Sequence, residues 1–442
     1  MVSSKLKKIE ENENGTNSID RIKSFLKTIK KEIRSYYIII FCVGTGILIS
    51  LLRMQIDGVG YSSDEYDIYA EYFKGIFQNK LSFEQELWFD GYRLKNRILY
   101  PFILSIGSLI TTLEPAIIAI PLGIIFFLLS ILTTIQILKE RGNSQKEINI
   151  IVSPFAVTPG LLPHMVRPTT DHLFMLLVLI VLLFIIRFVK RGDNLNLLIA
   201  IFFSLLAIIT REFGFLLLFI LPILYIVKWM EEKRYLMILV CGIFIIILIW
   251  ILLQILNFTP SFVLSLIFGV YTEKIQEIII SGNVSLEGVF QILHIRFIEQ
   301  WTQKGFLRTY ELIESVIYTI FIAFIFSFLG FLSWDKEKKV KEVKNVERSV
   351  LVVWFILGIF SLMILHGTLQ ARYWMPIMII PYLEIPSGIN YLHIKLKRKL
   401  SEKMILSLIL IIQITISIIR IVFTTMNISL RDVINVLSLY IA

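Results

Sequence analysis

The chain has 442 residues, of which 56% are hydrophobic, and its 44 Lys and Arg outnumber its 34 Asp and Glu. Apolar runs of roughly 18–22 residues recur along its length, as a bilayer core about 30 Å thick requires, and they exclude a soluble globular protein. We expect an all-α polytopic membrane protein with about 11–13 transmembrane helices. The basic excess indicates asymmetry between loops, so no nucleic-acid partner is expected.

The polar residues 1–35 precede the first apolar run, which therefore indicates a signal anchor and not a cleaved signal peptide. We expect this basic N-terminal segment to stay in the cytoplasm, where it can lie on anionic lipid. Residues 36–442 are predicted to form a single multi-span membrane domain with exocytoplasmic loops at 53–97 and 257–311. The expected spans are 36–52, 98–113, 116–138, 148–166, 170–187, 195–210, 213–228, 235–256, 312–333, 349–366, 373–390 and 404–423.

The distribution of Lys and Arg predicts the orientation, because cytoplasmic loops are enriched in them. Six segments hold 29 of the 44 basic residues and should be cytoplasmic: 1–34, 139–146, 187–191, 228–234, 336–348 and 395–403. The loop 53–97 has six basic residues against eight acids and should lie outside. Residues 98–138 start outside and should end in the cytoplasm, so they must cross the membrane an odd number of times. Because this region looks like two spans, 98–113 either dips into the membrane and returns or lies on the surface as a juxtamembrane helix.

Residues 61–73 (YSSDEYDIYAEYF) bring Asp64, Glu65 and Asp67 together just beyond the first span. Carboxylates this close repel one another, and at least one should have a raised pKa. Such a cluster is typical of a general base, a metal site or a cation path. The alternative is an ordinary capped helix N-terminus, where acids are favoured by the helix dipole.

Arg93 and Arg97 are one helical turn apart, just before the apolar segment that contains Tyr100. Two guanidiniums at this spacing suit a phosphate or carboxylate partner. Snorkelling of both side chains to the membrane interface is the alternative.

The segment 153–174 cannot form one plain helix, because it contains Pro154, Pro159, Pro163 and Pro168. Broken backbone at membrane depth survives only when it is buried in protein or lines a cavity. Arg167 and Asp171 follow the break and are candidate site residues, whereas His172 is expected to be a packing residue. Alternatively, Asp171 caps the next helix and pairs with Arg167.

Two further charged clusters are predicted to lie on the same outer face. Arg211 and Glu212 stand between two apolar runs, where charges normally face a bundle interior and pair, or form an exposed turn. His366 and Arg372 mark a later helix end, and Arg372 suits either a lipid phosphate or an interfacial anchor. No nucleotide-binding, HExxH or Cys-rich motif is present, and an activated substrate should therefore arrive on a lipid carrier.

The order of these motifs resembles the GT-C class of integral-membrane glycosyltransferases, which includes the protein O-mannosyltransferases and the aminoarabinose transferases of lipid A. The resemblance covers roughly residues 36–390. It runs from a signal anchor and an acidic first loop with juxtamembrane helices to a proline-interrupted segment and outer arginines. The motifs are Asp64-Glu65, Arg97 to Pro101, Pro163 to Asp171, Arg211-Glu212 and Arg372.

The resemblance implies transfer of a sugar from a polyprenyl-phosphate donor at the exocytoplasmic face, either without a metal or assisted by a divalent cation. Asp64 would be the base and Glu65 or Asp67 the second acid, while Arg372, with Arg211 or Arg97, would neutralise the phosphate. The acceptor could be a glycan, a lipid or a protein. Membrane lipids are the other expected partners. The Ile- and Lys-rich composition points to a prokaryotic plasma membrane.

Three other classes remain as alternatives: a secondary transporter or flippase, a glycan polymerase, and a non-catalytic scaffold. A transporter also needs broken helices and carboxylates, but it places them near mid-membrane. Here the carboxylates gather in an outer loop, and the later spans are nearly free of Asp and Glu.

Overall fold

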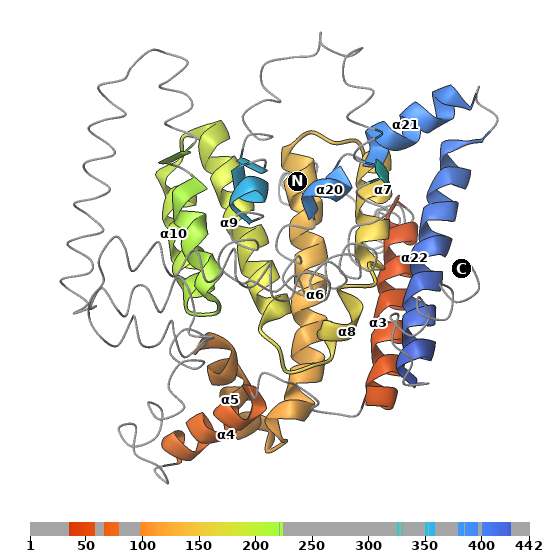
Figure 1. Cartoon of the computed structure of the whole chain (residues 1–442). Coiled ribbons are helices and arrows are strands. Elements are labelled where there is room, and N and C mark those ends of the chain that lie inside the picture. Colours follow the sequence, from red (N-terminus) through yellow and green to blue (C-terminus); the bar gives the residue numbers. More distant parts are fainter. Residues whose placement is uncertain are drawn as a thin grey trace, which may run out of the picture.

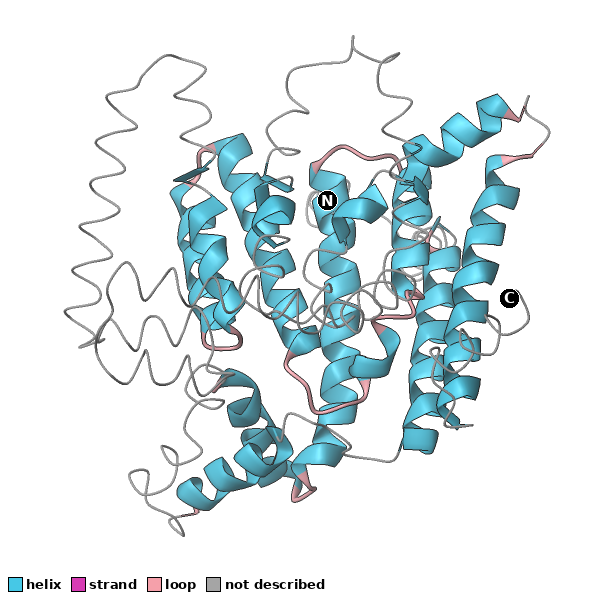
Figure 2. Cartoon of the chain, viewed as in Figure 1, coloured by secondary structure: helices cyan, strands magenta, loops and turns pink. Residues whose placement is uncertain are grey.

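The computed structural model describes the chain mainly over residues 35–57, 66–78, 98–220, 379–383, 385–396 and 400–425, with short pieces at 222–223, 325–326, 329, 350–351 and 353–358. Every regular element in these ranges is a helix, as Figure 2 shows. Four helical stretches are long and apolar enough to cross a membrane: Tyr37–Gln55, Pro115–Glu140, Asp171–Arg191 and Glu402–Ile419. The expectation of a helical integral membrane protein is confirmed to this extent.

The elements are numbered as in Figure 1. The first group is α3 (Tyr37–Asp57), α4 (Tyr66–Phe77), α5 (Leu99–Thr111), α6 (Pro115–Glu140), α7 (Gln145–Ala156), α8 (Leu162–Met165), α9 (Asp171–Arg191) and α10 (Asn194–Ile208). A 3-10 helix η1 (Glu212–Phe219) follows. The last group is α20 (Ile379–Leu383), α21 (Ile385–Lys395) and α22 (Glu402–Thr425).

Local sequence signals explain the tight turns between neighbouring helices. Pro115 is the first residue of α6, where its missing N–H is not needed. Ser144 and Glu147 form a capping box that starts α7 soon after α6 ends. Gly192 ends α9 with a φ of +68°, and the side chain of Asp193 then caps α10. The pairs α6–α7 and α9–α10 are therefore compact helical hairpins.

The basic turns lie together at one end of the bundle. The amide of Asn149, on α7, donates to the carbonyl of Ser35 at the start of α3 over 2.9 Å. Glu140, the last residue of α6, pairs with Arg187 at 2.8 Å and with Arg191 at 2.9 Å near the end of α9. We call this the basic end. The starts of α6 and α9 and the ends of α3 and α10 form the opposite end (Figure 1).

Helix α9 is the most enclosed of the four candidate spans, because α6 and α10 pack on either side of it. Helix α3 packs on α7, α8 and α22, and α7 also contacts α20 and α21. The interrupted region from α7 to α9 thus lies between the two groups of helices.

Helices α4 and α5 pack against each other at the opposite end (Figure 1). The rings of Phe73 and Phe77, on α4, meet the ring of Phe102 on α5 edge-on, with centroids 6.3 and 5.7 Å apart. Helix α5 has 13 residues, which at 1.5 Å per residue is roughly 20 Å and too short to cross a bilayer. A single short helix favours the juxtamembrane alternative for 98–113 over the dip that returns.

The structure corrects three of the expected boundaries. Helix α3 continues through Arg53 to Asp57, because no Gly or Pro lies between Arg53 and Gly58, so the outer loop begins later than residue 53. The expected span 148–166 is interrupted, since α7 ends at Ala156 and only the short α8 follows. The expected span 213–228 begins as the 3-10 helix η1 and not as an α-helix.

Much of the later chain lies outside the described residues. This holds for the N-terminal segment before residue 35, the expected spans 235–256 and 312–333, and the outer loop 257–311. The expected span 404–423 corresponds to α22, and the expected span 373–390 overlaps α20 and α21.

The close approach of α6 to α8 yields a test of the packing. A Cβ added at Gly123 would lie 1.8 Å from the carbonyl oxygen of Met165, whereas one added at Gly44 would meet nothing within 4 Å. Gly123→Ala should therefore destabilise the fold by about 1–3 kcal/mol. Gly44→Ala, the matched control, should be neutral or slightly stabilising, because Ala favours helix. Thermal unfolding in detergent measures both, and equal melting temperatures would contradict the packing described.

Candidate functional site

The backbone between α7 and α9, residues 157–170, is irregular apart from the short α8 and is almost wholly buried. Its peptide groups find partners in tight turns: the amide of Leu161 donates to the carbonyl of Thr158 over 3.0 Å, and that of His164 to the carbonyl of Leu161 over 3.2 Å. Irregular backbone at membrane depth is tolerated only where protein or a water-filled cavity surrounds it. The predicted break is thus confirmed, and we call residues 157–170 the interrupted segment.

An enclosed ion pair closes the interrupted segment against the α9–α10 hairpin. Asp171 is the first residue of α9, and Arg211 follows the end of α10, so the antiparallel hairpin brings them to the same level. Arg211 Nη1 lies 2.7 Å from Asp171 Oδ1, and the two side chains are 1% and 0% exposed. Two buried charges must be paired, because their mutual attraction offsets the loss of hydration.

Two histidines lie beside this ion pair. His164 Nδ1, from α8, is 3.9 Å from Asp171 Oδ2. His172 Nε2 is 3.1 Å from the carbonyl oxygen of Leu161, and its ring meets Phe127 edge-on at 6.0 Å. His172 is therefore a packing residue, as expected. His164 was missed, because the chain spacing between His164 and Asp171 gives no signal for a contact made across a break.

A second buried polar network joins the interrupted segment to the C-terminal helices. The hydroxyl of Tyr382, on α20, lies 2.6 Å from Thr158 Oγ1 and accepts a bond of 2.9 Å from Gln413 Nε2 on α22. The ring of Phe155 meets Tyr382 edge-on at 5.6 Å. Sequence reasoning missed this network too, because each polar residue stands alone within an apolar run.

Several predicted site residues can be placed. Asp171 and Arg211 come together, Tyr100 is buried on α5, and Arg167 is partly buried in the interrupted segment. The backbones of Asp67 and Glu212 lie in α4 and η1, but their side chains are outside the described part. The remaining predicted residues fall outside the described residues altogether: Asp64, Glu65, Arg93, Arg97, His366 and Arg372.

The geometry overturns two of the alternatives. Asp171 forms its ion pair with Arg211, at 2.7 Å, and not with Arg167 as the alternative had it. An exposed turn at Arg211 is also wrong, since that side chain is 1% exposed. The expectation that Arg211 faces the bundle interior and pairs there is confirmed.

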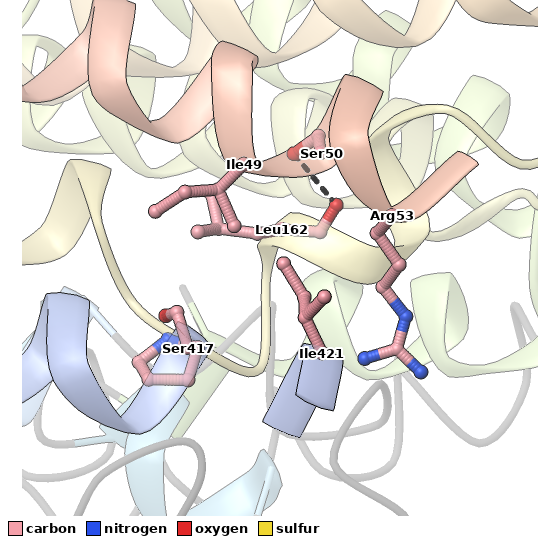
Figure 3. Close-up of a pocket in the computed structure, with 7 residues that line it drawn as sticks. Ile49, Ser50, Arg53, Leu162, Ser417 and Ile421 are labelled. Carbon is pink, nitrogen blue, oxygen red and sulfur yellow. Dashed lines mark hydrogen bonds between the residues drawn. The ribbon is translucent and has the colours of Figure 1, made fainter. Parts of the chain in front are cut away.

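A small pocket lies on the other side of α8, between α3 and α22. Its walls are Ile49, Ser50, Arg53, Pro159, Leu162, Ser417 and Ile421. Figure 3 shows the side chain of Arg53 extending from α3, with Ile421, on α22, drawn between it and Ser417.

Within the described residues, no group of three or more His, Cys, Asp and Glu side chains could hold a metal ion. The side chains of the acidic cluster at 64–67 lie outside the described residues, so binding of a divalent cation there stays a prediction. Compared with known proteins, the chain matches no family model and no curated protein. Its function is therefore inferred from its residues and their geometry.

The enclosed pair gives a second prediction. Asp171→Asn leaves the Arg211 charge buried without its carboxylate, which should cost about 3–5 kcal/mol of stability. The double variant Asp171→Asn/Arg211→Gln should lose clearly less than the sum of the two single losses, because it removes both charges of the pair together. Thermal unfolding of the four proteins in detergent measures this coupling.

Lys146 and Glu402 provide the matched control, since they pair across α7 and α22 with side chains 65% and 29% exposed. Lys146→Gln, Glu402→Gln and their combination should change stability by only about 0–1 kcal/mol. Additive losses at Asp171 and Arg211, like those at the control pair, would show that the enclosed pair is not coupled.

Proposed function

We propose that this protein is a GT-C-type membrane glycosyltransferase, which moves a sugar from a polyprenyl-phosphate carrier to a glycan, lipid or protein acceptor on the exocytoplasmic face. The observation that best supports it is a shared location. The interrupted segment runs from the middle of the bundle toward the opposite end, where the Asp171–Arg211 pair and the helices α4 and α5 lie (Figure 1).

The position of the predicted catalytic segments in the chain supports the proposal. Residues 58–65, with Asp64 and Glu65, connect the end of α3 to α4, and residues 79–97 connect α4 to α5. The helix ends that they join all belong to the opposite end (Figure 1). We propose that the first-loop acids and Arg97 act at this end, which also carries the enclosed ion pair.

In the proposed reaction, Asp64 accepts the proton of the acceptor hydroxyl while the acceptor oxygen attacks the anomeric carbon. The bond from that carbon to the phosphate oxygen breaks, its electron pair stays on the phosphate, and the configuration inverts. A phosphate diester becomes a monoester, so negative charge grows on the leaving group. Arg97 and Arg372 offset this charge, as fixed guanidiniums do when they are in place beforehand. Glu65 or Asp67 orients the acceptor or shares a divalent cation.

Arg211 has a positioning role in this scheme. It is held by Asp171 and follows the turn at Ile209 and Thr210, and the carbonyl of Ile209 accepts the amide of Leu99 over 3.2 Å. Leu99 starts α5 two residues after Arg97 in the chain. The enclosed pair therefore helps to fix the start of α5.

The transporter or flippase is the second candidate, and one observation favours it. Helix α7 is interrupted and followed by buried charges, as in the broken helices of secondary transporters. The same features suit a glycan polymerase. A transferase differs from all of these in needing the first-loop carboxylate for turnover while its donor still binds.

Orientation gives a third prediction, because we propose that the basic end faces the cytoplasm of a prokaryotic cell. In a background with both native cysteines replaced, Glu114→Cys, at the exposed start of α6, should react with a membrane-impermeant maleimide on intact cells. Lys146→Cys, at the basic end, should react only after the membrane is opened. The reverse pattern of labelling would place the proposed active site in the cytoplasm and contradict sugar transfer from a lipid carrier on the exocytoplasmic face.

The reaction itself is tested by the carrier that co-purifies with the protein. In Asp64→Asn, bound donor should persist without turnover, so native mass spectrometry should find more glycosylated carrier and less bare polyprenyl phosphate than in the wild type. Glu71→Gln, an exposed carboxylate on α4 that pairs with Lys74, is the control and should match the wild type. Arg372→Ala should lose the carrier in both forms. Only bulk phospholipid in all four proteins would contradict the proposal.

A further inference from the structure

Two arginines near the end of α9 share a single carboxylate at the basic end. Arg187 Nε donates to Glu140 Oε1 over 2.8 Å, and Arg191 Nη2 donates to the two oxygens of the same carboxylate over 2.9 and 3.0 Å. We call Glu140, Arg187 and Arg191 the Glu140 cluster. One carboxylate between two guanidiniums leaves one positive charge in excess.

The carboxylate lies deeper than the cations that it holds. Its side chain is 15% exposed, whereas those of Arg187 and Arg191 are 24% and 56% exposed. The guanidinium of Arg187 also lies over the ring of Phe184, with its central carbon 5.4 Å from the ring centroid. The two cations are therefore held from below by the protein, and less conformational freedom is lost when they bind an anion.

The bonds to Glu140 use only part of each guanidinium. They occupy Nε of Arg187 and Nη2 of Arg191, while a guanidinium carries five N–H donors in a planar fork. A fork of this shape matches the oxygens of a phosphate. The nearest acid along the chain, Asp193, accepts from the amide of Leu195 over 3.0 Å, so its carboxylate serves the start of α10.

The Glu140 cluster lies where a membrane helix meets the lipid headgroups. The candidate spans formed by α6 and α9 end at Glu140 and Arg191. The end of α9 stands beside the start of α10 (Figure 1), where Leu195 and Leu198 are 61% and 63% exposed. Cations held at the edge of the hydrocarbon layer, beside an exposed apolar surface, match a molecule with an anionic head and acyl chains.

We propose that the Glu140 cluster binds the headgroup of an anionic phospholipid. Arg187 and Arg191 contact the phosphate, and the acyl chains lie along the exposed apolar surface of α10. Glu140 positions the two guanidiniums and does not touch the lipid. The lipid comes from the leaflet at the basic end, so its binding depends neither on the proposed transferase activity nor on which side of the membrane that leaflet faces.

Glu140 distinguishes this site from a general attraction between basic residues and lipid. General attraction grows with net positive charge, so removal of an acid would strengthen the binding of anionic lipid. In the proposed site, removal of Glu140 releases the guanidiniums of Arg187 and Arg191 from their fixed positions. Binding should then weaken although the positive charge of the surface has increased.

A native mass spectrometry titration of the purified full-length protein tests the site, with phosphatidylglycerol as the anionic lipid and phosphatidylcholine as the zwitterionic one. The wild type should bind one phosphatidylglycerol more tightly than any phosphatidylcholine. Arg191→Gln should weaken this first binding roughly tenfold, as the loss of a charge-assisted hydrogen bond does. Arg191→Lys should fall between the two, because it keeps the charge and loses the planar fork. Glu140→Gln should weaken the binding as well.

Lys146 and Glu402 again provide the matched controls, because they pair with each other at the same end of the bundle. Lys146→Gln removes a cation and Glu402→Gln removes an acid, and both should leave the first binding unchanged. Stronger binding of phosphatidylglycerol in Glu140→Gln would show general attraction and overturn the proposal. Wild-type affinity in Arg191→Gln, or equal affinity of the wild type for the two lipids, would overturn it too.

Discussion

The arrangement of the opposite end depends on the enclosed ion pair between Asp171 and Arg211. The bundle is built around α9, and this pair fixes where α9 begins relative to the end of α10. Water cannot replace either partner at that depth, so each charge constrains the other strongly. The start of α5 then docks on the turn held by the pair, through the bond from Leu99 to Ile209. Much of the geometry near the outer loop therefore follows from one contact.

The interrupted segment shows why a membrane protein would keep such a costly pair. A continuous helix would satisfy its own backbone, whereas a broken one needs partners from its surroundings. The segment's backbone obtains partners from its own turns, and the side chain of Thr158 ties it to Tyr382 and Gln413 on the other side. With both sides held, α8 can carry His164 toward Asp171 and Leu162 toward the pocket of Arg53. A broken helix thus separates two polar regions with different surroundings.

The sequence predicted the fold where the physics is local. Apolar runs located α3, α6, α9 and α22 to within a few residues, because hydrophobic length is a direct requirement of the bilayer. Prolines located the break after α7. The partners across the bundle were not predictable, since Asp171 could as well have paired with the nearer Arg167, and only the α9–α10 hairpin decides for Arg211. His164 and Tyr382 gave no signal for the same reason, because their contacts depend on the tertiary arrangement.

The α9–α10 hairpin also has a consequence for how the chain is made. Its two ends carry opposite charges, and its turn at Gly192 and Asp193 is formed by neighbouring residues alone. Asp171 and Arg211 can therefore meet as soon as this stretch has left the ribosome, before any later helix exists. An inserting hairpin with its acid and base already neutralising each other places a pair in the bilayer instead of two separate ions. The same contact that orders the mature bundle would then ease the entry of these helices into the membrane.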